Sequence, residues 1–273
     1  MTLLGLWVDD PPRTVAQPSY WNELRDLGVR VAAIMVDSVL AGWDLAYHQD
    51  QLRRCIGYAI ERDIEVVITT WPEPKAPALR AMANGVRELL RLGAVGWEVD
   101  LEGQWQPRFV QGYPSLAAAA ADLASEMDLV RYDLDCRAEV TTHTGHHEHG
   151  VGARVSTKVD RFLSQSYSTR HDWQGREVAW DSAMGPGRRQ TAAIAQARTI
   201  PGVAAGRPRL SVGLAAWDQQ WPGHSLQEAF TVALKAALAC DPPDVRYWSS
   251  KWLVGAKRRP ALLAAWQSAI RSV

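Results

Sequence analysis

Several features are scarce in this sequence, and each scarcity excludes a class of protein. Only three cysteines occur, far apart and without the spacing of metal ligands, so we expect buried structural thiols. No apolar run approaches the roughly 18–20 residues of a membrane-spanning helix, and the N-terminal residues lack the basic segment and apolar length of a signal peptide. The 30 Lys and Arg residues balance 30 Asp and Glu, which disfavours a basic surface for nucleic acid. We therefore expect a protein that binds neither membrane nor nucleic acid.

Phenylalanine is scarce as well, with three residues, whereas tryptophan is abundant, with thirteen. An indole ring stacks on the C–H face of a sugar and offers its N–H as a donor, although part of this excess serves core packing. Several tryptophans fall near the ends of expected strands: Trp71, Trp97, Trp105, Trp217, Trp221 and Trp248. Their placement favours a cleft lined for sugar rings.

Strand-like and helix-like segments alternate along the chain. The expected strands are 3–8, 29–36, 64–70, 94–101, 136–142, 161–167, 209–216 and 245–249. The expected helices are 18–27, 49–62, 76–91, 115–132, 187–198, 225–239 and 259–271, whereas residues 143–160 lack the pattern of a full helix. Such alternation predicts a parallel sheet. Eight strands with a closing helix predict an α/β fold of the (β/α)8 TIM-barrel type.

Residues 1–273 are expected to form a single domain, since no low-complexity linker divides them. An open doubly wound sheet is the alternative, which the lack of a glycine-rich phosphate loop after an early strand disfavours. In a barrel the functional site lies at the carboxyl ends of the strands. The residues expected there are Asp9, Asp10, Asp37, Trp71, Glu73, Asp100, Glu102, His143, Tyr167, Trp217, Asp218 and Trp248. Acidic and aromatic side chains are therefore expected together at the open end of the barrel formed by the carboxyl ends of the strands, which we call the mouth.

The most informative segment is 96–102, Gly-Trp-Glu-Val-Asp-Leu-Glu, at the end of an apolar stretch. Because side chains alternate along a strand, Glu98, Asp100 and Glu102 project from one face. Burying three neighbouring carboxyl groups costs several kcal/mol apiece unless they are paired or one keeps its proton. This row of carboxyl groups therefore predicts a proton donor beside a second carboxyl group that stays ionised. A solvated edge strand is the alternative interpretation.

This segment resembles the D-G-x-D-x-D-x-E motif that ends the fourth barrel strand of family 18 glycosidases, the chitinases and their relatives. Gly96, Asp100 and Glu102 match, whereas Val95 and Glu98 stand at the first two Asp positions. The resemblance implies that Glu102 is the general acid. It also implies that Asp100 orients a substrate N-acetyl group, whose carbonyl oxygen attacks the anomeric carbon.

The same family places a Tyr at the end of strand six and a Trp at the end of strand eight. Tyr167 and Trp248 match these positions, while Ser168 stands where the family has Asp. From this resemblance and the strand ends together, we expect catalysis to depend on Glu102, Asp100, Asp9 and Tyr167. Substrate contacts are expected from Glu98, Trp71, His143, Trp217, Asp218 and Trp248.

Family 25 lysozymes are similar too, as barrels with an Asp on the first strand and D-x-E on a middle strand. Asp9, the run 100–102 and residues 20–29 match that arrangement. Both families hydrolyse N-acetyl-hexosamine polymers, which implies a glycoside hydrolase that cleaves β-1,4 linkages in peptidoglycan, ahead of chitin. The lack of a signal peptide and of a wall-binding repeat suits a phage or prophage endolysin, which stays cytoplasmic until lysis or travels on the virion.

Two other interpretations compete with this one. Four histidines within 143–149 form a candidate metal cluster, but the first strand has no His, so a substrate-contacting or surface loop is favoured. A barrel of the chitinase type that has lost its acid is a sugar-binding lectin; the presence of Glu102 favours an enzyme. We expect no metal and no cofactor.

Two mechanisms remain open at this stage. In the first, Glu102 is the general acid, its pKa raised by the charges of Asp100 and Glu98, while Asp100 stays ionised and the acetamido oxygen attacks. In the second, Asp9 lies across the cleft as a base on water and inverts the anomeric centre. Asp9 and Asp10 are alternatively simple turn residues before Pro11.

Overall fold

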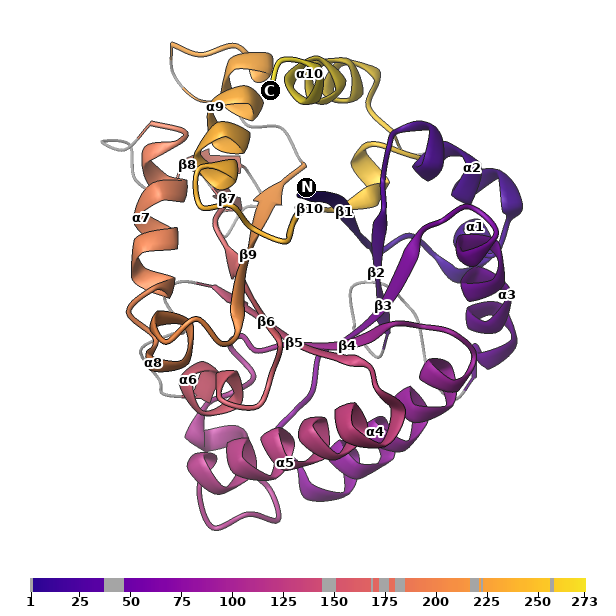
Figure 1. Ribbon diagram of the computed structural model, residues 1–273, viewed down its shortest axis with the longest axis vertical. Helices are drawn as coiled ribbons and strands as arrows, with labels where there is room; N and C mark the ends of the chain where they lie inside the picture. The colour runs from indigo at the N-terminus through magenta and orange to yellow at the C-terminus, as the bar shows by residue number, and fades with distance from the viewer. Residues whose placement is uncertain are drawn as a thin grey trace.

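The structure, a computed structural model, describes residues 2–36, 47–143, 151–167, 169–171, 177–179, 185–216, 221, 223–255 and 258–273. Eight parallel strands close into a barrel (Figure 1) in the order β1-β10-β9-β6-β5-β4-β3-β2. They are β1 (Leu3–Val8), β2 (Val31–Val36), β3 (Glu65–Thr70), β4 (Gly96–Asp100), β5 (Arg137–His143), β6 (Arg161–Gln165), β9 (Arg209–Ala215) and β10 (Asp244–Trp248). The predicted TIM barrel is confirmed.

A ring of helices surrounds the strands (Figure 1). The long ones are α2 (Pro18–Asp26), α3 (Gln49–Ile60), α4 (Ala76–Arg91), α5 (Leu116–Leu134), α7 (Arg188–Ala197), α9 (Leu226–Leu238) and α10 (Pro260–Arg271). Local sequence explains several of their starts. Proline occupies the first turn of α2, α4 and α10, where its missing N–H costs no hydrogen bond. Ser225 and Glu228 form a capping box at α9, and Ser115 caps α5.

Shorter elements fill the remaining connections: α1 (Pro12–Val15), α6 (Val151–Ser156), α8 (Pro201–Ala204) and the 3-10 turns η1 (Pro107–Phe109) and η3 (Ser250–Trp252). The short α6 agrees with the expectation that the fifth unit has no full helix. Between β6 and α7, two strands that the sequence pattern did not indicate, β7 (Thr169–His171) and β8 (Glu177–Ala179), pair antiparallel.

The alternative interpretations of the sheet are wrong. β4 is hydrogen-bonded to β3 on one side and to β5 on the other, so the segment with the three carboxyl groups is not an edge strand. β1 pairs with β10, which closes the sheet and excludes an open doubly wound arrangement.

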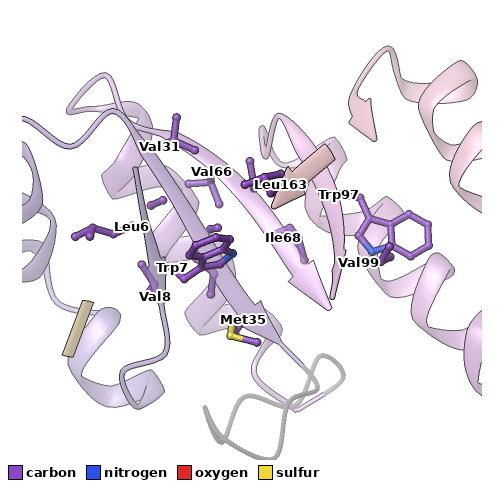
Figure 2. Packing of buried hydrophobic residues seen from close by; sticks show 14 of the residues in the cluster. Leu6, Trp7, Val8, Val31, Met35, Val66, Ile68, Trp97, Val99 and Leu163 are labelled. Carbon is purple, nitrogen blue, oxygen red and sulfur yellow. The ribbon is translucent and has the colours of Figure 1, made fainter. Parts of the chain in front are cut away.

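Side chains leave each strand alternately towards the barrel interior and towards the helices. Trp7 projects from β1 into the barrel, whereas Trp97 and Val99 project from β4 towards the helices (Figure 2). Gly213 on β9 leaves room for the Trp7 ring, because a Cβ there would lie 2.7 Å from it. Both faces of the strands are therefore buried, as parallel sheets require.

Two expectations from composition concern the whole chain. In the described part, no helix has both the length and the apolar character needed to cross a membrane. Cys55 is a buried free thiol, and Cys136 and Cys240 are free and half-buried.

Candidate active site

Parallel strands bring the candidate side chains to one end of the barrel. Asp9 directly follows β1, Asp100 ends β4 with Glu102 two residues beyond, Tyr167 lies two residues beyond β6, and Trp248 ends β10. Because all these strands run the same way, their carboxyl ends surround one mouth. The electrostatics agree: burial raises the pKa of Tyr167 well above its usual value, and the charges of Asp100, Glu102 and Asp9 raise it further.

Asp100 is a buried carboxyl group that holds its proton strongly. Its side chain is 3 % exposed, and Gln165 on β6 donates a hydrogen bond from Nε2 to Asp100 Oδ1 at 3.0 Å. Burial raises the pKa of Asp100 well above its usual value, the charges of Glu102 and Glu98 add to this, and the Gln165 bond opposes it. The expectation that Asp100 stays ionised is therefore corrected, because desolvation acts most strongly inside the barrel.

Glu102 is half-buried and lies past the end of β4, in a turn that hydrogen bonds fix on both sides. Gln104 accepts from the Glu102 backbone N–H at 3.0 Å and donates to the Asp100 carbonyl at 2.8 Å. Trp105 donates its backbone N–H to the Glu102 carbonyl and its indole N–H to the Pro72 carbonyl. The turn thus sets the position of Glu102 relative to Asp100. The sequence pattern identified Gln104 and Trp105 only as the start of a loop.

Asp9 and Asp10 connect the end of β1 to the segment after β10. Lys251 Nζ donates to Asp9 Oδ2 at 2.7 Å. Tyr20 and Ser250 donate their hydroxyls to Asp10 Oδ2 at 2.9 and 2.8 Å, and burial raises the Asp10 pKa. These contacts are more extensive than those of turn residues that merely begin a loop.

Glu98 was expected to contact substrate, but its side chain is buried inside the barrel, below the mouth. Trp7 Nε1 and Thr69 Oγ1 donate to its Oε1 at 2.6 and 3.0 Å, and Arg246 donates to its Oε2 at 2.6 Å. Burial raises the pKa of Glu98 to about 7, while Arg246 opposes the rise. Glu98 is fully buried and accepts hydrogen bonds from three donors, so no part of its side chain is accessible to substrate. These bonds stabilise the barrel interior beneath the mouth.

The centre of this lower layer is Arg246, which no sequence pattern indicated. Its guanidinium crosses the barrel interior from β10 and pairs with Glu98 on β4, Glu139 on β5 and Asp244 on its own strand. Arg161 on β6 adds a second cation beside Asp244 at 3.0 Å. Burial alone lowers the pKa of Arg246, but the three carboxylates raise it above its usual value, so the guanidinium stays charged.

The aromatic residues divide into two groups. Trp248 is half-buried, 6.0 Å from the Trp7 ring between centroids. Trp248 and Trp252 pack against Tyr167 and Ala215 and also against the main core. Trp252 was not predicted; it directly follows Lys251. Trp71 is half-buried at the end of β3.

By contrast, three other tryptophans are buried side chains, so their expected role in lining a cleft is corrected to packing: Trp97, Trp105 and Trp221. Trp97 donates its indole N–H to Thr70 Oγ1 on the helix side of the sheet.

Several expected positions lie outside the described residues: Asp37, Trp217, Asp218 and the segment 144–150 with most of the histidine cluster. His143 ends β5, so its backbone reaches the mouth. Within the described ranges, no three His, Cys, Asp or Glu side chains are grouped so as to hold a metal ion.

Solved structures of carbohydrate-active barrels have the same fold. A class V chitinase from Pseudomonas fluorescens Pf-5 aligns with a TM-score of 0.61 and 12% identity, over 99% of this chain and 100% of that one. The catalytic domain of a hyperthermophilic chitinase from Pyrococcus furiosus gives 0.61 and 12%, over 99% and 95%. A GH5-4 endoglucanase from Clostridium longisporum gives 0.64 and 11%, over 94% and 86%. No family model and no curated protein matches the sequence.

At such identities the likeness establishes the barrel fold. Tryptophan synthase from M. tuberculosis, which has a different activity, aligns with a TM-score of 0.55 and 13% identity. The choice among functions therefore depends on the side chains at the mouth.

Proposed function

We propose that this protein is a glycoside hydrolase that cleaves β-1,4 linkages in an N-acetyl-hexosamine polymer. The observation that carries the proposal is the pair formed by Asp100, buried with a raised pKa, and Glu102, half-buried beyond the strand. The charge of Glu102 raises the pKa of Asp100, so the two groups do not both ionise readily and, in this proposal, share one proton. The chitinases with the same barrel support the substrate class.

In this mechanism the shared proton moves from Asp100 to Glu102 when substrate binds. The substrate acetamido N–H donates to Asp100 and stabilises its ionised form, and Glu102 then protonates the leaving glycosidic oxygen. The acetamido carbonyl oxygen attacks the anomeric carbon in place of an enzyme nucleophile. Water next opens the cyclic intermediate while Glu102 takes back a proton, which gives retention. Tyr167 keeps its proton because its pKa is raised, so it can donate to the acetamido oxygen.

Peptidoglycan is the polymer that we propose first, because Asp9 together with Asp100 and Glu102 resembles the sequence arrangement of the family 25 lysozymes, which cleave it. Chitin is the second candidate, since two of the barrels with the same fold are chitinases. Origin in a lytic phage stays a prediction from the sequence.

The decisive variant is Glu102→Gln, which preserves shape and removes the transferable proton. We expect turnover to fall by a factor of about 10²–10⁴ while glycan binding persists. Products from purified sacculi and from chitin oligomers, analysed by mass spectrometry, identify the polymer. Glu88→Gln on α4, where the side chain is 58% exposed, is the matched control and should leave turnover unchanged. Full activity of Glu102→Gln, or release of peptides without glycan cleavage, would refute the proposal.

A further inference from the structure

Two buried oxygen atoms at the ends of β1 and β10 lack hydrogen-bond partners among the described residues. They are Oδ1 of Asp9, a residue 4 % exposed, and Oγ of Ser249, a residue that is fully buried. Leaving such a buried group unsatisfied destabilises the protein, and a charged group more than a neutral one. Both residues directly follow their strands at the mouth. A molecule that supplies hydrogen-bond donors there would recover this free energy.

Lys251 provides the complementary donor beside them. Its ammonium group bonds Asp9 Oδ2 at 2.7 Å, and the side chain remains 30 % exposed. An ammonium carries three N–H donors, and Asp9 uses one. The same ammonium lies 5.4 Å from the centre of the Trp252 ring, and Trp252 packs in the cluster with Trp248 and Tyr167. A charged acceptor, a charged donor and aromatic surface therefore meet at one place on the rim.

We propose that Asp9, Ser249 and Lys251 form a sugar subsite that binds two neighbouring hydroxyl groups of one pyranose ring. One hydroxyl donates to Asp9 Oδ1, and its neighbour accepts from Lys251 Nζ, so that both bonds are charge-assisted. Trp248 and Trp252 offer apolar surface for the C–H face of the ring. The subsite depends on the proposed glycoside hydrolase function and specifies which residues hold the substrate on this side of the mouth.

The ion pair also assigns Asp9 to binding instead of proton transfer. The contact from Lys251 Nζ to Asp9 Oδ2 holds the carboxylate towards the segment after β10. An inverting mechanism would need Asp9 to take a proton from water in the rate-determining step. A binding role predicts that loss of Asp9 acts on KM, whereas a basic role predicts that it acts on kcat.

The test measures binding of tetra-N-acetylchitotetraose by calorimetry in the Glu102→Gln background, where no turnover interferes. Asp9→Asn and Lys251→Met should each raise the Kd of the oligosaccharide by about tenfold or more. The Kd of the double variant should be only slightly higher than that of either single variant, because both side chains bind the same sugar ring. Lys251→Arg should keep part of the affinity. Lys235→Met, at an exposed position on α9, is the control and should bind as the parent does.

The outcomes separate this subsite from the proposed function. If the Glu102→Gln parent binds neither this oligosaccharide nor soluble peptidoglycan fragments, the substrate class itself is refuted. If the parent binds but the Asp9 and Lys251 variants, shown to be folded by their thermal transitions, bind equally well, the subsite alone is refuted. In protein that retains Glu102, Asp9→Asn should raise KM with little change in kcat. A loss of kcat by 100-fold or more with inverted product would make Asp9 the base and overturn the proposal.

Discussion

Desolvation acts unequally on the three carboxyl groups of residues 98–102. Glu98 has Arg246 and two further donors to offset its burial, whereas Asp100 has the Gln165 amide. Glu102 is half-buried and retains contact with solvent. Asp100 is therefore the member of the row whose ionisation the fold disfavours most clearly, and it stands between the other two.

Asp100→Asn should therefore stabilise the protein while it abolishes activity. The folded pKa of Asp100 lies above its unfolded value, so stability falls as pH rises from about 4. Asparagine removes this penalty and still accepts from Gln165. We expect a transition temperature roughly 2–4 °C higher at pH 8, corresponding to about 1 kcal/mol, and no gain near pH 4.

Thermal denaturation of both proteins at the two pH values checks this expectation. Asp133→Asn, at an exposed position on α5, is the control for loss of one negative charge. An equal stability difference at both pH values would show that the ionisation of Asp100 is not its cause.

The sequence could locate Asp100 and Glu102 because their spacing on one strand is local information. It could not assign the role of Glu98, since the partner Arg246 lies 148 positions away and meets it only when the barrel closes. For the same reason the roles of Gln165 and Lys251 were missed. Each is recognisable only from its partner at the end of another strand, Asp100 for Gln165 and Asp9 for Lys251.

At the level of elements, apolar strands and amphipathic helices were predicted to within a few residues. The errors lie at strand ends, where backbone pairing stops before the apolar pattern does. The sixth strand was expected to reach Tyr167, but β6 ends at Gln165. β7 and β8 were missed because each has three residues, too few for a period-two pattern to show.

Glycine in the strands offers a test of how tightly the barrel interior is packed. Gly213→Ala on β9 would place a Cβ 2.7 Å from the Trp7 ring, and displacing that ring would disturb its bond to Glu98. We expect a loss of about 1–3 kcal/mol in the free energy of unfolding. Chemical denaturation provides the measurement.

Gly57→Ala is the matched control for this substitution. Gly57 lies within α3, and a Cβ there meets nothing within 4 Å. The same change should stabilise the protein by about 0.5–1 kcal/mol, because alanine favours the helix. If both variants changed stability in the same direction, tight packing around Trp7 would not explain the effect at Gly213.

For the molecule as a whole, the Arg246 network connects opposite walls of the barrel. β10 and β4 are separated by three strands in the sheet order on one side, yet Arg246 bonds Glu98 directly. Gly5 on the neighbouring strand leaves space for the arginine stem, since a Cβ there would lie 2.8 Å from its Cγ. The cation thus pairs with carboxylates that come from three strands.

Arg246→Met should destabilise the protein by about 3–5 kcal/mol at neutral pH, because it leaves the buried Glu98 without a cation, whereas Glu139 and Asp244 keep Arg137 and Arg161. Without it the folded pKa of Glu98, which burial already raises, rises further above the unfolded value, so the deficit should shrink as pH falls. Urea unfolding at pH 5 and pH 7.5 measures both effects. Arg271→Met, exposed at the end of α10, should change neither, and a deficit independent of pH would exclude unpaired carboxylates as its cause.

The carboxyl groups of this network are synthesised before the arginine that pairs with them. Glu98 and Glu139 leave the ribosome more than a hundred residues before Arg246, which belongs to the last barrel strand. Until that strand arrives, Glu98 lacks its cation and remains hydrated, because dehydrating it alone is costly. We therefore expect the nascent barrel to stay open at its centre, and the row that carries Asp100 to reach its final environment only after β10 has been synthesised.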